Sequence, residues 1–243
     1  MRSEPYTSGK LLDVHVPDGL DVQSPDRRTD VPVVLAWHGS GPDERDALAP
    51  LAGELAARGV LVLVPDWQSD DVGPGCDQLL ASVAFARTEA RALGADPERI
   101  VLAGWSLGAN AAVHLGLHPG AVDGWSPSAF VGLGGSYAGS PFGPDLFAGS
   151  AAAPGRRMLL IHGSADTLVP AARSVEAAGR LVGLGWAARL RRVGTDHAGV
   201  IGTVYNRVRH RCVPTEDPIR AVVRGVVADL VADVAFASSP HRR

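Results

Sequence analysis

The sequence predicts one α/β domain built on a mostly parallel central sheet with helices on both faces. Short apolar runs rich in β-branched residues alternate with longer amphipathic segments along the chain, as expected of strand–helix–strand units. The 243 residues fit a single domain, and no repeat, linker or shift of composition divides them. We therefore expect one domain over residues 1–243, with its catalytic core at about 31–235.

The first half of the chain supplies the clearest elements. Leu11–Val16 is a candidate first strand, and a turn rich in Pro and Asp follows it as far as Asp30. Val31–Trp37 is a continuous apolar run, which favours a strand buried on both faces. Asp43–Arg58 carries apolar residues at helical spacing, with Asp43 as a cap and Gly59 as a stop.

The alternation then continues to the end of the chain. Further strands are predicted at Val60–Val64, Ile100–Ala103, Ala129–Leu133, Met158–Ile161 and Ala187–Val193, each an apolar run of strand length. Further helices are predicted at Asp77–Leu93 (ended by Gly94), Leu107–Leu117, Ala171–Val182 and Ile219–Ala235. The segment Gly134–Arg157 is rich in small residues, so we expect a loop with one short helical turn and no large lid. The tail Ser238–Arg243 is expected to fray.

Composition excludes several classes of protein. The 23 basic and 26 acidic residues give a net charge of −3, so no basic surplus favours nucleic-acid binding. The apolar runs are too short to span a membrane, and the first residues lack the apolar core of a signal peptide, so we expect a cytoplasmic protein. Cys76 and Cys212 form neither a disulfide framework nor a metal cluster, and two free thiols are expected.

Chemistry-bearing residues follow three of the predicted strands. The segment Gly104-Trp105-Ser106-Leu107-Gly108 follows the strand at Ile100, Asp166 follows the strand at Met158, and His197 follows the strand at Ala187. Ligands of parallel sheets bind beyond the carboxyl ends of the strands, so a serine, an acid and a histidine should meet at one edge.

Ser106 is the predicted nucleophile. A strand that turns at once into a helix needs a sharp bend, and side chains larger than glycine at 104 and 108 would collide with neighbouring backbone. The bend exposes the Ser106 hydroxyl at a helix N-terminus, where free N–H groups favour negative charge.

A serine hydroxyl needs a base, and His197 is the candidate by loop position and chain order. His38 and His162 also follow strands, but neither has an acid at a suitable spacing. The acid that fixes the tautomer of His197 is predicted to be Asp166. Asp145, after the preceding strand, is the alternative acid.

The neighbouring residue Asp196 is disfavoured as that acid because adjacent side chains of an extended loop point apart. An oxyanion hole completes such a site. Its two donors are predicted to be the N–H groups of Leu107, which follows the nucleophile, and of Ser40 in His38-Gly39-Ser40-Gly41.

Together these motifs resemble the α/β-hydrolase family, above all its small serine carboxylesterases and dienelactone-hydrolase-like members. Gly104–Gly108 is similar to the nucleophile elbow, and His162-Gly163-Ser164-Ala165-Asp166-Thr167-Leu168-Val169-Pro170 resembles the acid turn of that family. The resemblance covers about residues 31–235 and implies the α/β-hydrolase fold. Two departures limit what it implies about substrate: dienelactone hydrolases use cysteine as the nucleophile, and His38–Gly41 differs from the His-Gly-Gly-Gly form of many lipases.

We therefore expect a cofactor-independent carboxylic ester hydrolase that acts on a small ester through an acyl-enzyme. No metal or cofactor motif is present, the expected partner is a small-molecule ester and neither nucleic acid nor membrane, and the sequence leaves the oligomeric state open. Two alternatives stay open: a thioesterase, acyltransferase or cyclase that uses the same triad, and a slow-turnover binding protein on the same fold. The candidate pocket residues are His38, Trp67, Tyr137, Phe142, Val169, Val200 and Tyr205, each of which could instead be part of the loop core.

Overall fold

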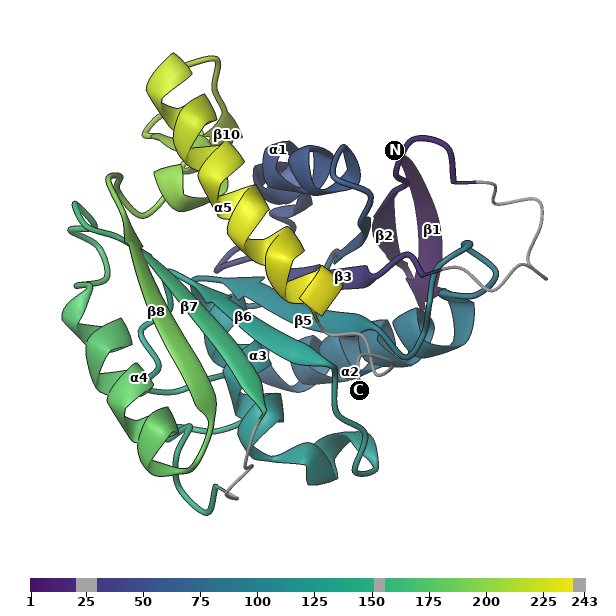
Figure 1. Ribbon diagram of the computed structural model, residues 1–243, viewed down its shortest axis with the longest axis horizontal. Helices are drawn as coiled ribbons and strands as arrows, with labels where there is room; N and C mark the ends of the chain where they lie inside the picture. Colours follow the sequence, from purple (N-terminus) through teal and green to yellow (C-terminus); the bar gives the residue numbers. More distant parts are fainter. Residues whose placement is uncertain (21–29, 151–155, 238–243) are drawn as a thin grey trace.

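A twisted eight-stranded sheet runs through the centre of the protein, as Figure 1 shows for the computed structural model. The structure describes residues 1–20, 30–150 and 156–237. In the order of the sheet, the strands are β1 (Arg2–Thr7), β2 (Lys10–His15), β4 (Leu61–Pro65), β3 (Val33–Trp37), β5 (Ile100–Trp105), β6 (Ala129–Leu133), β7 (Arg157–Gly163) and β8 (Ala187–Val193). From β4 to β8 every pairing is parallel, whereas β1 and β2 join antiparallel.

Five helices cover the two faces of the sheet in the part of the chain that is described. They are α1 (Arg45–Ala56), α2 (Val72–Glu89), α3 (Leu107–Leu117), α4 (Ala172–Gly183) and α5 (Pro218–Ala237). One apolar core joins α2, α3 and α4 to the sheet, and a second joins α1 and α5 to its other face. Successive strand residues alternate between these cores, so that Val34 faces α1 and Leu35 faces α2. The predicted α/β-hydrolase fold is confirmed.

The structure differs from the expected elements mainly at the N-terminus and near the last helix. Strand β1 was not expected, nor was the hairpin of β9 (Thr203–Asn206) and β10 (Arg211–Pro214). Helix α2 begins at Val72 rather than at Asp77, so Cys76 lies in the helix and not in a loop. Helix α1 begins at Arg45, two residues later than expected.

The predicted stop at Gly59 is confirmed by its left-handed φ of 84°. The predicted tail 238–243, and the turn before Asp30 over residues 21–29, lie outside the described residues.

The connection between β6 and β7 forms the predicted loop, and its described part contains turns at 146–149 but no helix. Within its described part, residues 134–150, the chain makes turns and an isolated bridge between Ser140 and Gly143. The Asn110 side chain on α3 donates to Ser136 and to the Gly139 carbonyl, and accepts from the Tyr137 N–H. These polar contacts fix the loop on α3.

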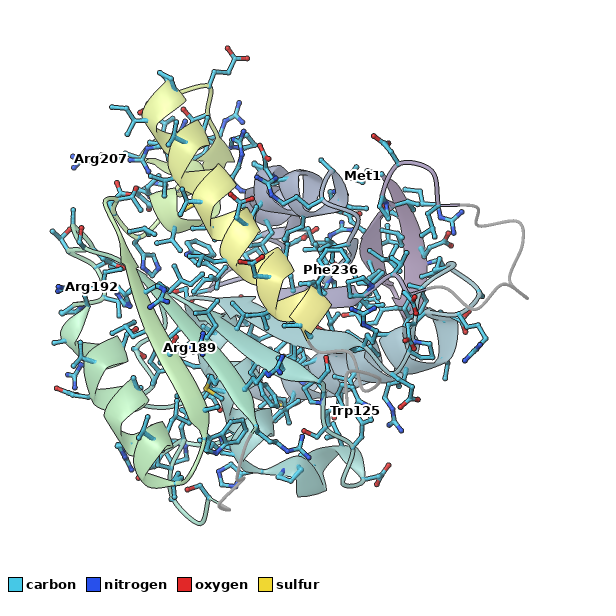
Figure 2. The ribbon with its side chains drawn as sticks, in the orientation of Figure 1. Met1, Trp125, Arg189, Arg192, Arg207 and Phe236 are labelled. Atoms are coloured by element: carbon cyan, nitrogen blue, oxygen red, sulfur yellow. The ribbon has the colours of Figure 1, made fainter. Side chains whose placement is uncertain are left out.

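Strand β8 forms one edge of the sheet and carries Arg189, Arg191 and Arg192 at exposed positions, and β1 forms the other edge. Figure 2 shows Arg189 and Arg192 along this strand. Charged side chains on an edge strand disfavour pairing with a strand of another molecule. No helix in the described ranges is both long and apolar enough to cross a membrane.

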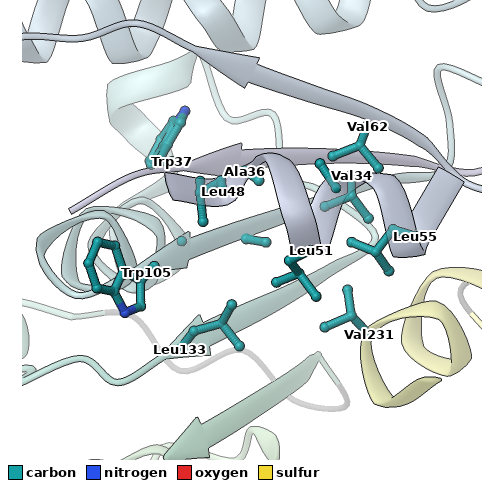
Figure 3. Close-up of a pocket in the computed structure, with 13 residues that line it drawn as sticks. Val34, Ala36, Trp37, Leu48, Leu51, Leu55, Val62, Trp105, Leu133 and Val231 are labelled. Atoms are coloured by element: carbon teal, nitrogen blue, oxygen red, sulfur yellow. The ribbon is translucent and has the colours of Figure 1, made fainter. Parts of the chain in front are cut away.

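A small cavity of about 20 Å³ lies beneath α1 (Figure 3). Glycine and apolar side chains line it, among them Leu48, Leu51 and Leu55 from α1 and Val231 from α5. A substrate site needs convergent polar groups in addition to apolar walls. We therefore assign this cavity to imperfect packing of the α1 side of the core.

Candidate active site

The turn between β5 and α3 holds Ser106 in a strained conformation. Its φ of 56° and ψ of −117° place a non-glycine residue in a region that L-residues rarely occupy. A Cβ atom at Gly104 would lie 2.1 Å from the Gly108 carbonyl oxygen, and one at Gly108 would lie 2.3 Å from the carbonyl oxygen of Trp37. The prediction that only glycine fits at 104 and 108 is thus confirmed. The Ser106 N–H donates to the Leu133 carbonyl at 2.8 Å, which anchors the turn to β6.

The loops after β7 and β8 bring Asp166 and His197 together. His197 Nδ1 lies 2.7 Å from Asp166 Oδ2, and the carboxylate side chain is fully buried. The other oxygen, Oδ1, accepts from the backbone N–H groups of Leu168 and Val169 at 2.9 and 2.8 Å. Because a carboxylate can only accept, Nδ1 of His197 carries the hydrogen, and Nε2 is left with its lone pair to act as a base.

Two residues place the His197 ring beside the strained turn. The Trp105 indole N–H donates to the His197 carbonyl at 3.1 Å, and the two rings lie 5.2 Å apart. A Cβ atom at Gly134 would lie only 3.3 Å from His197 Nδ1. Trp105 directly precedes Ser106, so the indole connects the histidine loop to the serine turn. A place for Gly134 in the site was not predicted from the sequence.

The other candidate acids are engaged elsewhere. Asp196 forms an ion pair with Arg220 at 2.7 Å, and the hydrogen bond from that guanidinium lowers the pKa of the Asp196 carboxyl. Asp145 is exposed, and its Oδ1 accepts from the Phe147 N–H two residues later in the same loop. Of the three carboxylates considered in the sequence, Asp166 is the one that the structure hydrogen-bonds to the His197 ring.

The loop after β3 lies against the serine turn from the other side. A Cβ atom at Gly39 would lie 3.0 Å from the Cβ of Ser106. The Ser69 hydroxyl accepts from the Gly41 N–H at 2.6 Å and contacts the Gly41 carbonyl at 3.0 Å, which fixes the loop that carries Ser40. Leu107 is the first residue of α3, so its N–H has no acceptor within the helix.

His38 is wholly buried and supports this loop. Its Nδ1 lies 2.9 Å from the Gly39 carbonyl, its Nε2 accepts from the Trp67 N–H at 3.4 Å, and its ring stacks on that of Trp67. Burial lowers the pKa of His38 to about 4. His38 Nε2 or Nδ1, one Asp43 oxygen and one Asp66 oxygen lie within 4.8 Å of one another. Arg45 and Lys10 already pair with these two carboxylates and supply the positive charge that a cation would bring.

The remaining candidate pocket residues are spread over several environments. Trp67 and Val200 are wholly buried in the two apolar cores, and Tyr137 is buried where the 134–150 loop meets α3. Phe142 packs on the His114 ring, and Tyr205 is 53% exposed on β9. These positions favour core packing for Trp67 and Val200, and a role in the pocket stays a prediction for all of them.

One expectation about the histidines is wrong. His162 was taken to lack an acid at a suitable spacing, yet its Nε2 lies 3.2 Å from Asp166 Oδ2. The turn at 163–166 folds back on β7, and this reversal brings residues four apart in sequence into contact. The motif His162–Pro170 held the signal, because it places a histidine four residues before the predicted acid.

Comparison with known proteins supports the fold and gives no closer relationship. No family model and no curated protein matches the sequence. Among solved structures, esterase 2 of Thermogutta terrifontis phosphonylated by cyclosarin superposes with a TM-score of 0.75 at 15% identity, covering 97% of this chain and 94% of that one. The propionate-bound form of this thermophilic planctomycete esterase gives a TM-score of 0.72 at 16% identity, over 96% and 92% of the two chains. The paraoxon-phosphorylated form gives 0.71 at 16% identity, over 97% and 94%.

Proposed function

We propose that this protein is a serine hydrolase that cleaves small carboxylic esters through an acyl-enzyme on Ser106, with His197 as base and Asp166 as its acid partner. The observation that carries the proposal is the 2.7 Å contact between His197 Nδ1 and Asp166 Oδ2, formed at the same sheet edge as the strained Ser106 turn. The structurally similar Thermogutta esterase has been solved with propionate, with butyrate and with organophosphorus groups attached. Those ligands support a small acyl group and an activated serine for this chain as well.

The reaction follows from the proton positions in the site. His197 Nε2 takes the hydroxyl proton of Ser106 as Oγ bonds to the ester carbonyl carbon, and the carbonyl π electrons move onto its oxygen. The N–H groups of Leu107 and Ser40 stabilise this oxyanion, and the N-terminal end of α3 adds its positive dipole. The oxyanion collapses, the C–O bond to the alcohol breaks, and the leaving oxygen takes the proton from His197. A water molecule then gives a proton to His197 as its oxygen bonds to the acyl carbon. The bond from that carbon to Oγ breaks, Oγ takes the proton back from His197, and the acid leaves.

Asp166 serves this cycle by holding one tautomer of His197. Its carboxylate accepts the Nδ1–H and stabilises the imidazolium that forms in each half-reaction. Three hydrogen bonds, from the Leu168 and Val169 N–H groups and from His197 Nδ1–H, hold this buried carboxylate in place.

The test is hydrolysis of short p-nitrophenyl esters by the wild type, Ser106→Ala and the matched control Ser8→Ala. Ser8 is exposed in the turn between β1 and β2, so its loss should leave kcat unchanged. Ser106→Ala should lower kcat by about 10³-fold or more. Equal activity of the two variants would refute the proposal, and appearance of a new ester or amide when an alcohol or amine is added would favour the acyltransferase alternative.

A further inference from the structure

His162, at the end of β7, is fully buried and makes three polar contacts. Its Nε2 lies 2.8 Å from the carbonyl oxygen of Val169 and 3.2 Å from Asp166 Oδ2. Its Nδ1 lies 2.6 Å from the hydroxyl oxygen of Ser174, which is itself fully buried in the first turn of α4. The reaction proposed above uses neither His162 nor Ser174.

The partners of the ring fix where its hydrogens lie. A backbone carbonyl can only accept, so Nε2 must carry a hydrogen toward Val169. The hydrogen bond goes to Val169, and Asp166 Oδ2 lies 3.2 Å from the same nitrogen as a second polar contact. In the neutral ring, Nδ1 accepts from the Ser174 hydroxyl. Contacts at both nitrogens therefore fix the plane of the ring.

His162 is the fourth polar group in contact with Asp166. Oδ1 receives the two backbone N–H groups of the acid turn, Oδ2 receives His197 Nδ1–H, and the positive end of the His162 Nε2–H group lies beside Oδ2, with Nε2 at 3.2 Å. Without His162, the oxygen that faces His197 would keep its hydrogen bond and lose this contact. The carboxylate could then rotate about its Cβ–Cγ bond and lengthen its contact with the base.

We propose that His162 is a positioning residue that holds Asp166 Oδ2 in place for His197, with Ser174 orienting the His162 ring. The proposal rests on the proposed function, since it assigns His162 to the acid of that triad. His162 touches the acid and not the reacting atoms, so its loss should lower kcat and leave KM nearly unchanged.

Two substitutions at 162 separate positioning from simple packing. The amide nitrogen of glutamine is as many bonds from Cβ as Nε2 of histidine, so His162→Gln retains a donor toward Asp166 and Val169. The amide nitrogen of asparagine matches Nδ1 instead, so His162→Asn faces Ser174 and places no N–H group beside Asp166 Oδ2. We expect His162→Gln to keep kcat within about 3-fold and His162→Asn to lower it about 10-fold, which is the effect of losing one polar contact with a charged group.

A second readout does not depend on activity. The proton between His197 Nδ1 and Asp166 should give a far-downfield NMR resonance in the wild type and in His162→Gln. It should shift upfield or broaden in His162→Asn. If His162→Asn does not fold, Ser174→Ala serves as the second variant, with an expected drop in kcat of about 3-fold and the same direction of shift.

The outcomes separate failure of this proposal from failure of the proposed function. Equal kcat in His162→Gln and His162→Asn, with an unchanged resonance, would overturn the positioning role and leave the triad intact. A wild type that hydrolyses no ester and resists fluorophosphonate labelling would refute the proposed function. Even then, the NMR resonance tests whether His162 positions the Asp166–His197 pair. A resonance that is the same in the wild type, His162→Gln and His162→Asn would overturn the positioning role.

Discussion

Replacing Asp166 by asparagine has a consequence that can be worked out atom by atom. Oδ1 of Asp166 accepts two backbone N–H groups, from Leu168 and Val169, so the amide oxygen of the variant must take that position. The amide NH₂ then faces His197 Nδ1, which lies 2.7 Å from the oxygen it replaces. Two donors cannot share that contact, so His197 must move its hydrogen from Nδ1 to Nε2. The ring then presents N–H to Ser106 and can no longer accept the hydroxyl proton.

The expected loss of kcat is about 10³- to 10⁴-fold, or about 4–5 kcal/mol of transition-state stabilisation. The NH₂ also replaces an oxygen that lies 3.2 Å from His162 Nε2, and His162 cannot turn because its Nε2–H is donated to the Val169 carbonyl. This mismatch of buried donors should lower the free energy of unfolding by about 1–3 kcal/mol.

The assay pairs steady-state hydrolysis of p-nitrophenyl butyrate with urea denaturation of the same samples. Asp145→Asn is the matched control, since the Asp145 carboxylate is exposed and accepts a hydrogen bond from the Phe147 N–H within its own loop. The control should keep kcat within about 2-fold. An Asp166→Asn variant with more than a tenth of wild-type activity, or a larger loss in Asp145→Asn, would refute the reasoning.

Three further predictions concern substrate size, pH and thiols. Esters with acyl chains of about two to six carbons should be hydrolysed fastest, because the 134–150 loop is held on α3 and leaves no long lid to enclose a lipid chain. Burial lowers the pKa of His38 and of His114 to about 4. Between pH 6.5 and 4 these two histidines are therefore protonated in the unfolded chain and neutral in the folded chain. The free energy of unfolding should therefore fall toward acid by up to about 1.4 kcal/mol per pH unit for each histidine. A thiol reagent should find two equivalents in denatured, unreduced protein, since Cys76 and Cys212 are free.

Each of these predictions has an outcome that contradicts it. Rates that rise beyond ten acyl carbons, or that jump at an oil–water interface, would contradict the expected substrate size. Unfolding curves that do not change from pH 6.5 to 4 would contradict the buried neutral histidines. The variant His114→Gln supplies the control, because it should remove part of the slope. Recovery of no thiol before reduction would show that the two cysteines are bridged.

The serine turn could be predicted from the sequence because its requirements are local. Gly104 and Gly108 flank Ser106 at the two positions where a Cβ atom meets backbone, so the spacing alone predicts the bend. Asp166 and His197 could be predicted because both follow strands whose apolar runs are easy to recognise. Parallel pairing of β7 and β8 then brings the two loops to one edge.

Features that depend on contacts between distant segments were missed. Strand β1 is half exposed and carries Glu4 and Pro5, so its apolar pattern is weak, although Gly9 in the turn after it was a usable hairpin signal. Gly73 and Pro74 concealed the start of α2, because such residues break helix interiors but are tolerated in a first turn. The contact of His162 with Asp166 was missed although the two residues stand only four apart, because it forms when the turn at 163–166 reverses the chain.

The central claim is that Ser106 is an activated nucleophile, and covalent labelling tests it most directly. The wild type would be treated with a small fluorophosphonate, weighed intact by mass spectrometry and then digested for peptide mapping. We predict a mass increase of one phosphonyl group, located on Ser106, and no increase in Ser106→Ala. A wild type that stays unmodified, or an adduct that maps to another residue and persists in Ser106→Ala, would contradict the assignment.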